Sequence, residues 1–375
     1  MKALLFSLLA GIIFSVSSFN SRFGDGHKTL EIGAAAPDFK LMGVDDKMYD
    51  LASFEKARVL VVIFTCNHCP TAQCYEDRII NLTADYANKN VAVVAIMPND
   101  PQSLRLDELD FSDLGDSFAE MKIRAKEKKF NFPYLYDGDT EAVSRAYGPI
   151  ATPHVFVFDK ERKLRYEGRF DDTESPFKIP GETDTKNAID ALLNNREVPV
   201  KTTKVFGCSV KWSEKKELVQ KSLDAWAKEP VHLDTADKET MESIIKNVSG
   251  KLRLVNLWSI RSLVSVQEFP EFITINRMYR DRDFEFISIS TDGAGEREKI
   301  LKFLETQQAS NSNFLINPGQ NPAWFHSVNP GWHGDLPYTL LIEPGGKIVF
   351  AKEGSIDPAS LKKSIVNNHL IGRYP

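Results

Sequence analysis

The sequence predicts an α/β protein with two tandem domains, each built on a central mixed β-sheet flanked by helices. The chain has 375 residues, of which 42% are hydrophobic, and this is enough for two cores of roughly 150 residues each. The order strand, helix, strand, helix and β-hairpin occurs twice along the chain, which indicates a duplication of the fold. A strand–helix–strand unit makes a right-handed parallel crossover and a hairpin is antiparallel, so each sheet should contain both kinds of pairing.

The first domain is predicted over residues 28–200. Its central strand is 58–65, a continuous apolar run rich in β-branched residues, as expected for a strand that is covered on both faces. The other expected elements are a helix, a strand, two helical segments, a hairpin and a last helix, at 72–88, 91–97, 113–129, 141–147, 154–158 with 163–167, and 184–195.

A linker is expected at 201–216, where the periodicity fades, and the second domain at 217–375. The second domain repeats the order of the first, and its hairpin turns at Pro344-Gly345-Gly346. Its expected elements are a strand, a helix, a strand, a helix and the hairpin, at 252–258, 264–279, 284–290, 296–305, and 339–343 with 347–351.

Residues 1–19 have the pattern of a secretory signal peptide. Lys2 precedes the apolar run 3–14, and small serines follow before the chain becomes polar at Asn20. Because about 20 apolar residues are needed to cross a bilayer, this run is too short for a good span, and a retained N-terminal anchor is the alternative to cleavage. We therefore expect an exported, periplasmic protein with no other membrane segment.

The charges exclude one class of partner. The chain has 47 basic and 52 acidic residues, a formal net charge of -5, and they are spread along the sequence without a basic patch. Neutralising phosphates requires such a patch. Nucleic acid is therefore not an expected partner.

The cysteines indicate chemistry rather than a framework of structural disulfides. Only four occur, and three of them, Cys66, Cys69 and Cys74, lie within nine residues, whereas structural disulfides are spread along a chain. We interpret Cys66-Asn67-His68-Cys69 as a redox dithiol at the junction of a strand and a helix. The N-terminus of a helix stabilises a thiolate.

Each residue of this motif has an expected role. Cys66, at the helix start, is predicted to be the exposed nucleophile, and Cys69, one turn later, the resolving thiol. His68 adds positive charge that favours the Cys66 thiolate. A metal site that includes Cys74 is the alternative, but structural zinc usually takes a second ligand pair from a distant segment. The sequence has no such pair, so we expect neither a metal nor another cofactor.

Several segments of the first domain resemble the redoxin (AhpC/TSA-type) branch of the thioredoxin superfamily. The combination of Cys-x-x-Cys with a later Thr-Pro before a strand is more specific than either motif alone. The resemblance covers about half of the chain and implies a thioredoxin-like fold. The segments are 33–39 (GAAAPDF), 64–70 (FTCNHCP), 75–78 (YEDR), 151–153 (ATP) and 207–212 (GCSVKW).

The resemblance implies that Pro153 is cis and faces the dithiol, and that the backbone of Thr152 pairs with the strand that carries the substrate's disulfide. A strand-starting proline without a special role is the alternative for Pro153. Two features depart from the family. Leu60 stands six positions before the first cysteine, where thioredoxin has a buried acid, so proton transfer would fall to His68, water or another group. The peroxiredoxin signature Pro-x-x-x-Thr-x-x-Cys is also absent, which makes peroxidase activity the weaker hypothesis.

Two cysteines lie outside the dithiol. Cys208, in the segment 207–212, is either a buried apolar residue or an accessory thiol that exchanges with the dithiol. Cys74, on the helix after the dithiol, is expected to be packed rather than reactive.

The second domain resembles exported thiol-disulfide reductases of cytochrome maturation over residues 250–270, but Ser262 and Ser265 stand where those proteins have cysteines. Leu336-Pro337 matches their cis-proline. Serine cannot form a disulfide and is a poor nucleophile without a base, so we expect a redox-silent domain that serves as a binding platform, or as a spacer or dimerisation unit. A hidden serine hydrolase would need a histidine beside Ser262, and the candidates are His326 and His333.

The leading hypothesis is an exported thiol-disulfide oxidoreductase that acts on protein thiols and disulfides and exchanges electrons with a partner that the sequence does not identify. Two alternatives stay open. One is a thiol-dependent peroxidase, a peroxiredoxin-like antioxidant protein. The other is a non-catalytic binding protein in which the dithiol is vestigial.

Overall fold

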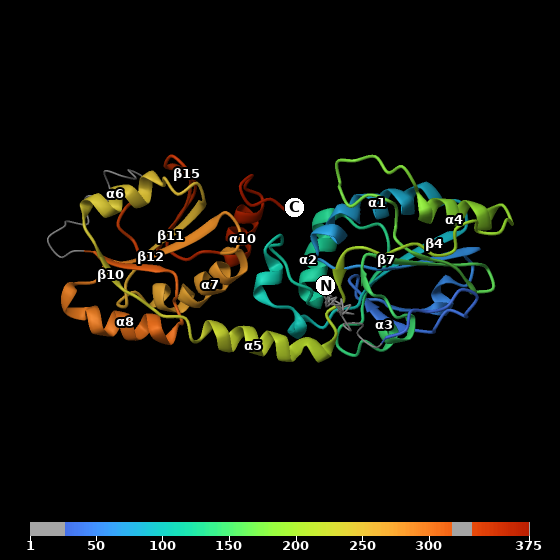
Figure 1. Cartoon of the computed structure of the whole chain (residues 1–375), viewed down its shortest axis with the longest axis horizontal. Coiled ribbons are helices and arrows are strands. Elements are labelled where there is room, and N and C mark those ends of the chain that lie inside the picture. The colour runs from blue at the N-terminus through green and yellow to red at the C-terminus, as the bar shows by residue number, and fades with distance from the viewer. Residues whose placement is uncertain (1–26, 317–331, 375) are drawn as a thin grey trace, which may run out of the picture.

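The computed structural model describes residues 27–316 and 332–374. Within them the chain forms two α/β domains, each on its own mixed sheet (Figure 1). This confirms the fold class predicted from the sequence. The predicted signal peptide, residues 1–19, lies outside the described residues, and none of the described helices is long and apolar enough to cross a membrane.

The first sheet has seven strands in the order β2-β1-β5-β4-β3-β7-β8. Its central strand β3 is parallel to β4 and antiparallel to β7, which gives the expected mixture of pairings. The elements of this domain are β1 (Lys40–Gly43), β2 (Met48–Asp50), β3 (Val59–Phe64), α1 (Pro70–Tyr86), β4 (Val91–Met97), α2 (Phe118–Lys128), β5 (Tyr134–Tyr136), α3 (Ala142–Tyr147), β6 (Ala151–Thr152), β7 (His154–Phe158), β8 (Leu164–Gly168) and α4 (Asp184–Leu193).

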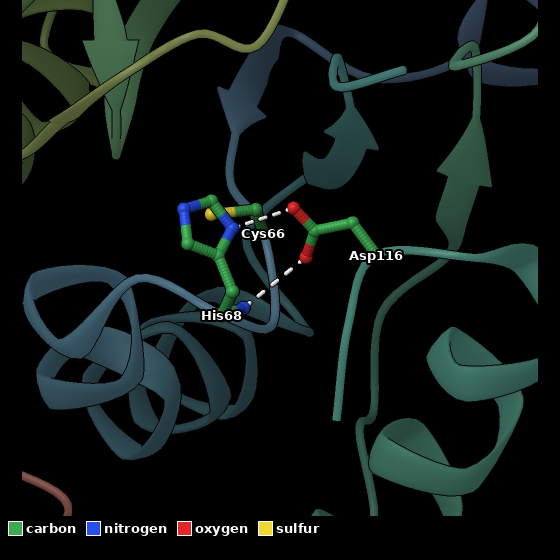
Figure 2. Close-up of side chains that lie close together, drawn as sticks. All are labelled: Cys66, His68 and Asp116. Carbon is green, nitrogen blue, oxygen red and sulfur yellow. Dashed lines mark hydrogen bonds and ion pairs between the residues drawn. The ribbon is translucent and has the colours of Figure 1, made fainter. Parts of the chain in front are cut away.

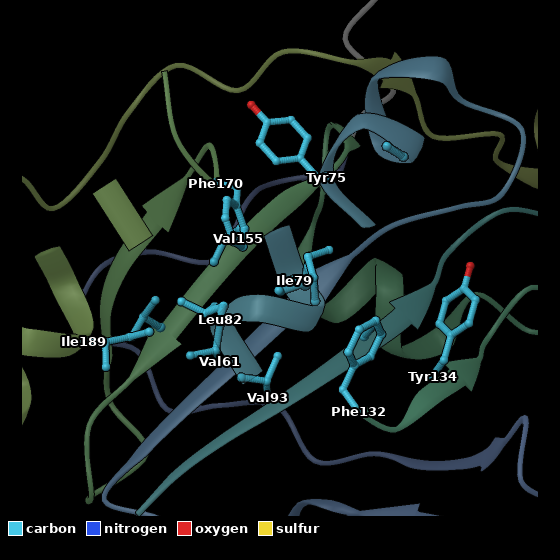
Figure 3. Packing of buried hydrophobic residues seen from close by; sticks show 14 of the residues in the cluster. Val61, Tyr75, Ile79, Leu82, Val93, Phe132, Tyr134, Val155, Phe170 and Ile189 are labelled. Carbon is cyan, nitrogen blue, oxygen red and sulfur yellow. The ribbon is translucent and has the colours of Figure 1, made fainter. Parts of the chain in front are cut away.

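Strand β3 is buried along its whole length because helices cover both faces of the sheet. Val61 packs in one hydrophobic cluster with Leu82 of α1 and Ile189 of α4 (Figure 3). The next residue, Val62, belongs to the cluster on the opposite face, with Tyr147 of α3. This alternation follows from the two-residue period of a strand. The end of β3 is thereby fixed between two packed layers, and the dithiol loop follows it directly.

The second sheet has six strands in the order β10-β13-β12-β11-β14-β15. β11 is parallel to β12 and antiparallel to β14, as β3 is to its neighbours. The elements are α5 (Lys216–Trp226), β10 (Asp234–Ala236), α6 (Lys238–Lys246), β11 (Leu252–Trp258), α7 (Leu263–Tyr279), β12 (Phe284–Ser290), α8 (Arg297–Thr306), β13 (Ser312–Ile316), β14 (Tyr338–Glu343), β15 (Lys347–Glu353) and α10 (Pro358–Val366).

The segment expected to be a linker, 201–216, packs against the first domain before α5 leads away from it (Figure 1). Thr202 forms an isolated bridge to Glu167 of β8. Further on, a short strand β9 (Cys208–Ser209) pairs antiparallel with β6. Most of this segment is therefore an ordered part of the first domain, and it brings Cys208 to the dithiol.

Candidate active site

The dithiol motif forms the loop between the C-terminal end of β3 and α1. The helix begins at Pro70, because proline is favoured at the first helical position, where its missing N–H is not needed. Cys69 is therefore the N-cap residue. The prediction that Cys66 lies exposed at the helix start was wrong: Cys66 is 3% exposed and Cys69 is 0% exposed. Cys69, not Cys66, occupies the position at the positive end of the helix.

Two backbone groups contact the sulfur of Cys69. The sulfur lies 3.5 Å from the carbonyl oxygen of Thr152, to which the protonated thiol donates, and the N–H of Cys208 donates to the sulfur at 3.4 Å. Burial raises the pKa of the Cys69 thiol, but hydrogen bonds from the thiols of Cys208 and Cys66 and the charge of His68 outweigh burial and hold this pKa well below its ordinary value. Cys69 is thus the cysteine that its surroundings favour as a thiolate.

Cys66 has the opposite electrostatic environment. Its sulfur lies 3.0 Å from the hydroxyl oxygen of Thr152. Burial, the hydrogen bond to Cys69 and the negative charge of Asp116 raise the pKa of the Cys66 thiol well above its ordinary value. The surroundings of Cys66 therefore favour its thiol form, whereas the sequence predicted Cys66 to be the thiolate.

A buried aspartate orients the loop between the two cysteines. Nδ1 of His68 lies 2.6 Å from Oδ2 of Asp116 (Figure 2). The same carboxylate accepts hydrogen bonds from the backbone N–H groups of Asn67 and His68 and from the side chain of Asn99, at 2.9, 3.1 and 2.7 Å. Burial lowers the pKa of His68, but the charge and the hydrogen bond of Asp116 outweigh it and raise this pKa. The positive charge of His68 lowers the pKa of the Cys69 thiol, whereas the sequence predicted this effect on Cys66.

Sequence reasoning missed Asp116 because it lies in a polar stretch that was interpreted as part of a helix. The helix α2 begins only at Phe118, after the capping residue Ser117, and Asp116 belongs to the preceding loop. A serine followed three residues later by Glu120 is a capping-box signal that could have placed this helix start. No local pattern in the sequence pairs Asp116 with His68.

Cys66, His68 and Asp116 are the one group of three metal-binding side chains found among the described residues, with ligand atoms within 4.8 Å of one another. Their hydrogen bonds indicate a different use. Four N–H groups already lie on the two oxygens of Asp116, so the lone pairs of this carboxylate are engaged in holding the loop. We therefore assign the group to the orientation of His68.

Thr152 and Pro153 lie beside the dithiol, and the bond between them is cis, as the resemblance implies. Thr152 is buried and contacts both cysteines, through its hydroxyl to Cys66 and through its carbonyl to Cys69. The backbone of Thr152, which was expected to pair with a substrate strand, pairs with Cys208 of the chain itself.

The four cysteines are all free thiols. Cys208 is partly exposed, whereas the other three are buried. Cys74 lies on the buried side of α1, and burial raises the pKa of its thiol to about 11. The structure thus brings Cys208 to the dithiol and leaves Cys74 in the packed environment predicted for it.

In the second domain, Ser262 is the N-cap of α7 and accepts a hydrogen bond from the N–H of Ser265. Its hydroxyl donates to the carbonyl oxygen of Leu336 at 3.2 Å, and the Leu336-Pro337 bond is cis. His333, a candidate base, is exposed and lies 2.9 Å from Glu353. His326 lies outside the described residues. Among the residues that the structure describes, no histidine hydrogen bonds to Ser262.

Comparison with known proteins identifies the first domain. A family model described as Redoxin matches residues 31–188. Over 172 residues the chain is 28% identical to alkyl hydroperoxide reductase E of Mycobacterium tuberculosis, a match that covers 44% of this chain and 96% of that protein.

Two solved structures are also similar to the chain. An uncharacterized conserved protein from Geobacillus kaustophilus has 36% identity, and the match covers 50% of this chain and 95% of that one with a TM-score of 0.44. The thioredoxin domain of a thiol-disulfide oxidoreductase from Bacteroides vulgatus has 15% identity, 44% and 96% coverage and a TM-score of 0.32. With the family model, the sheet order and the dithiol between β3 and α1, residues 31–188 are a redoxin domain of the thioredoxin superfamily.

Proposed function

We propose that the first domain is a thiol-disulfide oxidoreductase that works through Cys69 and Cys66. The observation that carries the proposal is a pair of neighbouring buried thiols with opposite pKa shifts, one favoured as a thiolate and the other kept protonated. Thiol-disulfide exchange needs a thiolate to attack and a second thiol to complete the reaction. The redoxin family of this domain supports the same class of chemistry.

The proposed reaction begins with attack of the Cys69 thiolate on one sulfur of a substrate disulfide. The substrate S–S bond breaks, a mixed disulfide forms on Cys69, and one substrate thiolate leaves. Cys66 then loses its proton and attacks the Cys69 sulfur, which forms the Cys66–Cys69 bond and releases the second substrate thiolate. The substrate gains two electrons and the couple loses them. The reverse sequence oxidises a dithiol.

The pair of His68 and Asp116 is the proposed route for the proton of Cys66. Leu60 is apolar and buried in β3, so it cannot transfer a proton. The sulfur of Cys66 and the polar atoms of His68 and Asp116 lie within 4.8 Å of one another. In its neutral form, His68 held by Asp116 can accept the proton at Nε2, which is buried and has no hydrogen-bond partner among the described residues, as the resolving attack begins.

The test compares two activities in the same preparation of the full chain. We expect the reduced protein to reduce insulin disulfides, and we expect this activity to be lost in Cys69→Ser. The Cys66→Ser variant should form a mixed disulfide with substrate and release it slowly. The matched control is Cys74→Ser, which removes a buried thiol of the same helix. Insulin reduction by Cys69→Ser at the wild-type rate would contradict the proposal.

A thiol peroxidase is the second candidate, and two observations favour it. Cys69 is favoured as a thiolate and has no surface exposure, so a small hydroperoxide can approach it more readily than a protein can. Nε2 of His68 is buried and has no hydrogen-bond partner among the described residues, so it is available to donate to a leaving hydroxide. Peroxide consumption with a dithiol donor separates the candidates, since an oxidoreductase should leave peroxide nearly untouched.

For the second domain we propose an assembly role within the chain: its contacts hold the loop that carries Asp116 in place. The hydroxyl of Tyr279 on α7 donates to the carbonyl oxygen of Ser112 at 2.8 Å, and Arg373 lies 2.6 Å from Asp113. Both contacts hold the loop within four residues of Asp116. Tyr279→Phe should therefore raise the pKa of Cys69 slightly, without a change in any group of the dithiol site. If the pKa of Cys69 were unchanged in the double variant Tyr279→Phe/Arg373→Ala, this role would be excluded.

We place this chemistry outside the cytosol, with protein thiols as substrates and a separate dithiol or disulfide protein as the electron partner. The support is the signal-like pattern of residues 1–19 together with the redox class of the first domain. Cell fractionation tests the location: the mature chain should be found in the exported fraction and should lack the first residues. Recovery of the unprocessed chain in the cytosol would contradict it.

A further inference from the structure

The edge of β6 beside the dithiol is occupied by a strand of the chain itself. In the β6–β9 pair, Thr152 lies opposite Cys208, and Ala151 lies opposite Ser209. Gly207 makes this close approach possible, because a Cβ atom built on it would lie 2.1 Å from the carbonyl oxygen of Thr152. Its φ of +131° is also one that other residues rarely adopt. The backbone is thus shaped to seat Cys208 against the dithiol.

Further contacts hold this strand in place. The N–H of Lys211 donates to Oδ1 of Asn99 at 2.8 Å, and the carbonyl of Lys211 accepts from the N–H of Asp100 at 2.9 Å. Asn99 in turn donates to Asp116. The segment that presents Cys208 and the carboxylate that orients His68 therefore share one hydrogen-bond network.

The thiols near Thr152 differ in their access to solvent. Cys66 and Cys69 are buried, and Cys208 is partly exposed. The N–H of Cys208 donates to the Cys69 sulfur, so the backbone of the exposed cysteine touches the buried one. The hydrogen bond to Cys69, together with burial, raises the pKa of the Cys208 thiol. An external thiol meets Cys208 before it can reach Cys69.

We propose that Cys208 is a third redox thiol, which carries a disulfide between the buried Cys66–Cys69 couple and thiols outside the protein. This inference rests on the proposed oxidoreductase function and adds the route by which that couple exchanges with its partner. The partner is a dithiol, either a small molecule or a protein with two neighbouring cysteines.

The proposed transfer balances in three steps. The Cys208 thiol loses its proton and attacks the Cys69 sulfur of the Cys66–Cys69 disulfide, so that the Cys69–Cys208 bond forms and Cys66 leaves and takes up a proton. A thiolate of the external dithiol then attacks Cys208, and Cys69 leaves as a thiolate. The second external thiol attacks its partner sulfur and releases Cys208. The external dithiol is oxidised to a disulfide, and the protein gains two electrons.

The second step, attack of the external thiolate on Cys208, is favoured because Cys69 and Cys208 differ in thiol pKa and in exposure. An exchange is faster when the leaving thiol has the lower pKa, and it occurs at the sulfur that can be reached. Cys69 has the lowered pKa, and Cys208 has the exposure. An external thiolate that attacks at Cys208 therefore expels the better leaving group.

The first experiment traps the intermediate in the full chain. Cys66→Ser removes the competing thiol; the variant is oxidised with diamide, quenched in acid, alkylated and mapped by mass spectrometry. We expect a Cys69–Cys208 disulfide as the main product, and the same product in Cys66→Ser/Cys74→Ser. Free thiols at both positions in folded, oxidised Cys66→Ser would overturn the inference.

The second experiment separates this inference from the proposed function. In Cys208→Ser the hydroxyl still donates to Cys69, but no disulfide can form. Reduction of the oxidised couple by an external dithiol should be roughly tenfold slower or more, while the Cys66–Cys69 disulfide still forms. If Cys208→Ser exchanged at the wild-type rate, the proposed role of Cys208 would be rejected and the proposed oxidoreductase function would stand. Failure of the wild-type chain to form a Cys66–Cys69 disulfide would reject both proposals.

Discussion

The two domains place different atoms at the same structural position. In the first, Cys69 is the N-cap of α1 and contacts the carbonyl oxygen of Thr152 at 3.5 Å. In the second, Ser262 is the N-cap of α7 and contacts the carbonyl oxygen of Leu336 at 3.2 Å. Both carbonyls belong to the residue before a cis-proline. A helix start beside this carbonyl is therefore shared by the fold, and it does not by itself make a redox site.

The difference lies in the groups around that position. Each loop is held by an aspartate: Asp116 in the first domain, and Asp292, which accepts from the N–H of Ile260 at 2.9 Å, in the second. Only the first loop adds His68 to this carboxylate, and only the first domain receives a further thiol from the linker. In both domains an aspartate holds the loop, and His68 and Cys208 are what the dithiol site has in addition.

The largest expected effect is on thiol-disulfide exchange, when Cys69 at the N-cap of α1 loses its sulfur. Cys69→Ser makes the first domain resemble the second at this position, and thiol-disulfide exchange should fall by roughly 10³-fold or more, since a hydroxyl without a base is a poor nucleophile. Rapid alkylation with iodoacetamide near pH 6 should label Cys69 in the wild type. Preferential labelling of Cys66 would show that the nucleophile is the one predicted from the sequence.

The second prediction removes the histidine that only the first domain has. In His68→Ala the pKa of Cys69 should rise, so alkylation near pH 6 should slow by about tenfold or more, while rates above pH 9 converge. The control is His154→Ala, which removes a buried histidine that pairs with Glu167 instead. An unchanged Cys69 pKa would mean that the helix N-terminus and the neighbouring thiols are sufficient.

The same histidine gives the stability of the fold a defined pH dependence. Asp116 raises the pKa of His68 above its ordinary value of 6.5. Its contribution to the free energy of unfolding is therefore complete below about pH 6.5 and is lost as the pH rises through the raised pKa. Urea unfolding of the wild type and of His68→Ala should differ less at pH 9 than at pH 6.

The third prediction disrupts the strand that only the first domain receives. Gly207→Ala places a Cβ against the carbonyl oxygen of Thr152, so β9 should move away, and alkylation of Cys69 should become several times faster. The free energy of unfolding should fall by about 1–3 kcal/mol. Gly250→Ala is the matched control, because Gly250 also has positive φ but no atom within 4 Å of its Cβ position. If Gly207→Ala and Gly250→Ala changed the alkylation rate of Cys69 equally, displacement of β9 would not be the cause.

The smallest effect is expected from adding sulfur to the second domain. Ser262→Cys should produce a thiol whose pKa is lowered by the start of α7 but stays above that of Cys69, because no histidine among the described residues hydrogen bonds to this position. Titration of thiolate absorbance near 240 nm compares the two. The double variant Ser262→Cys/Ser265→Cys should form a disulfide; two free thiols in a folded, oxidised protein would show that these serines do not occupy the positions of a lost dithiol.

The main elements could be predicted from the sequence because their signals are local. The central strands β3 and β11 are apolar runs that the sheet buries on both faces, and they lie at or within a residue of their predicted bounds. The dithiol and both cis-prolines were also recognisable as motifs. The helix α1 was predicted from residue 72 and begins two residues earlier, at Pro70, which carries the signal for a helix start.

Tertiary structure alone decided which cysteine is favoured as a thiolate and which groups surround the two sulfurs. Asp116 reaches His68 across 48 residues, and Cys208 reaches Cys69 across 139 residues. Neither contact has a local pattern, because each depends on how separate loops meet at the end of β3. The pKa values of Cys66 and Cys69 depend on burial and on these neighbours, which the folded chain brings together. The sequence by itself determined that the site is a dithiol at a strand–helix junction; the fold decided which sulfur lies at the helix N-cap and which groups surround each sulfur.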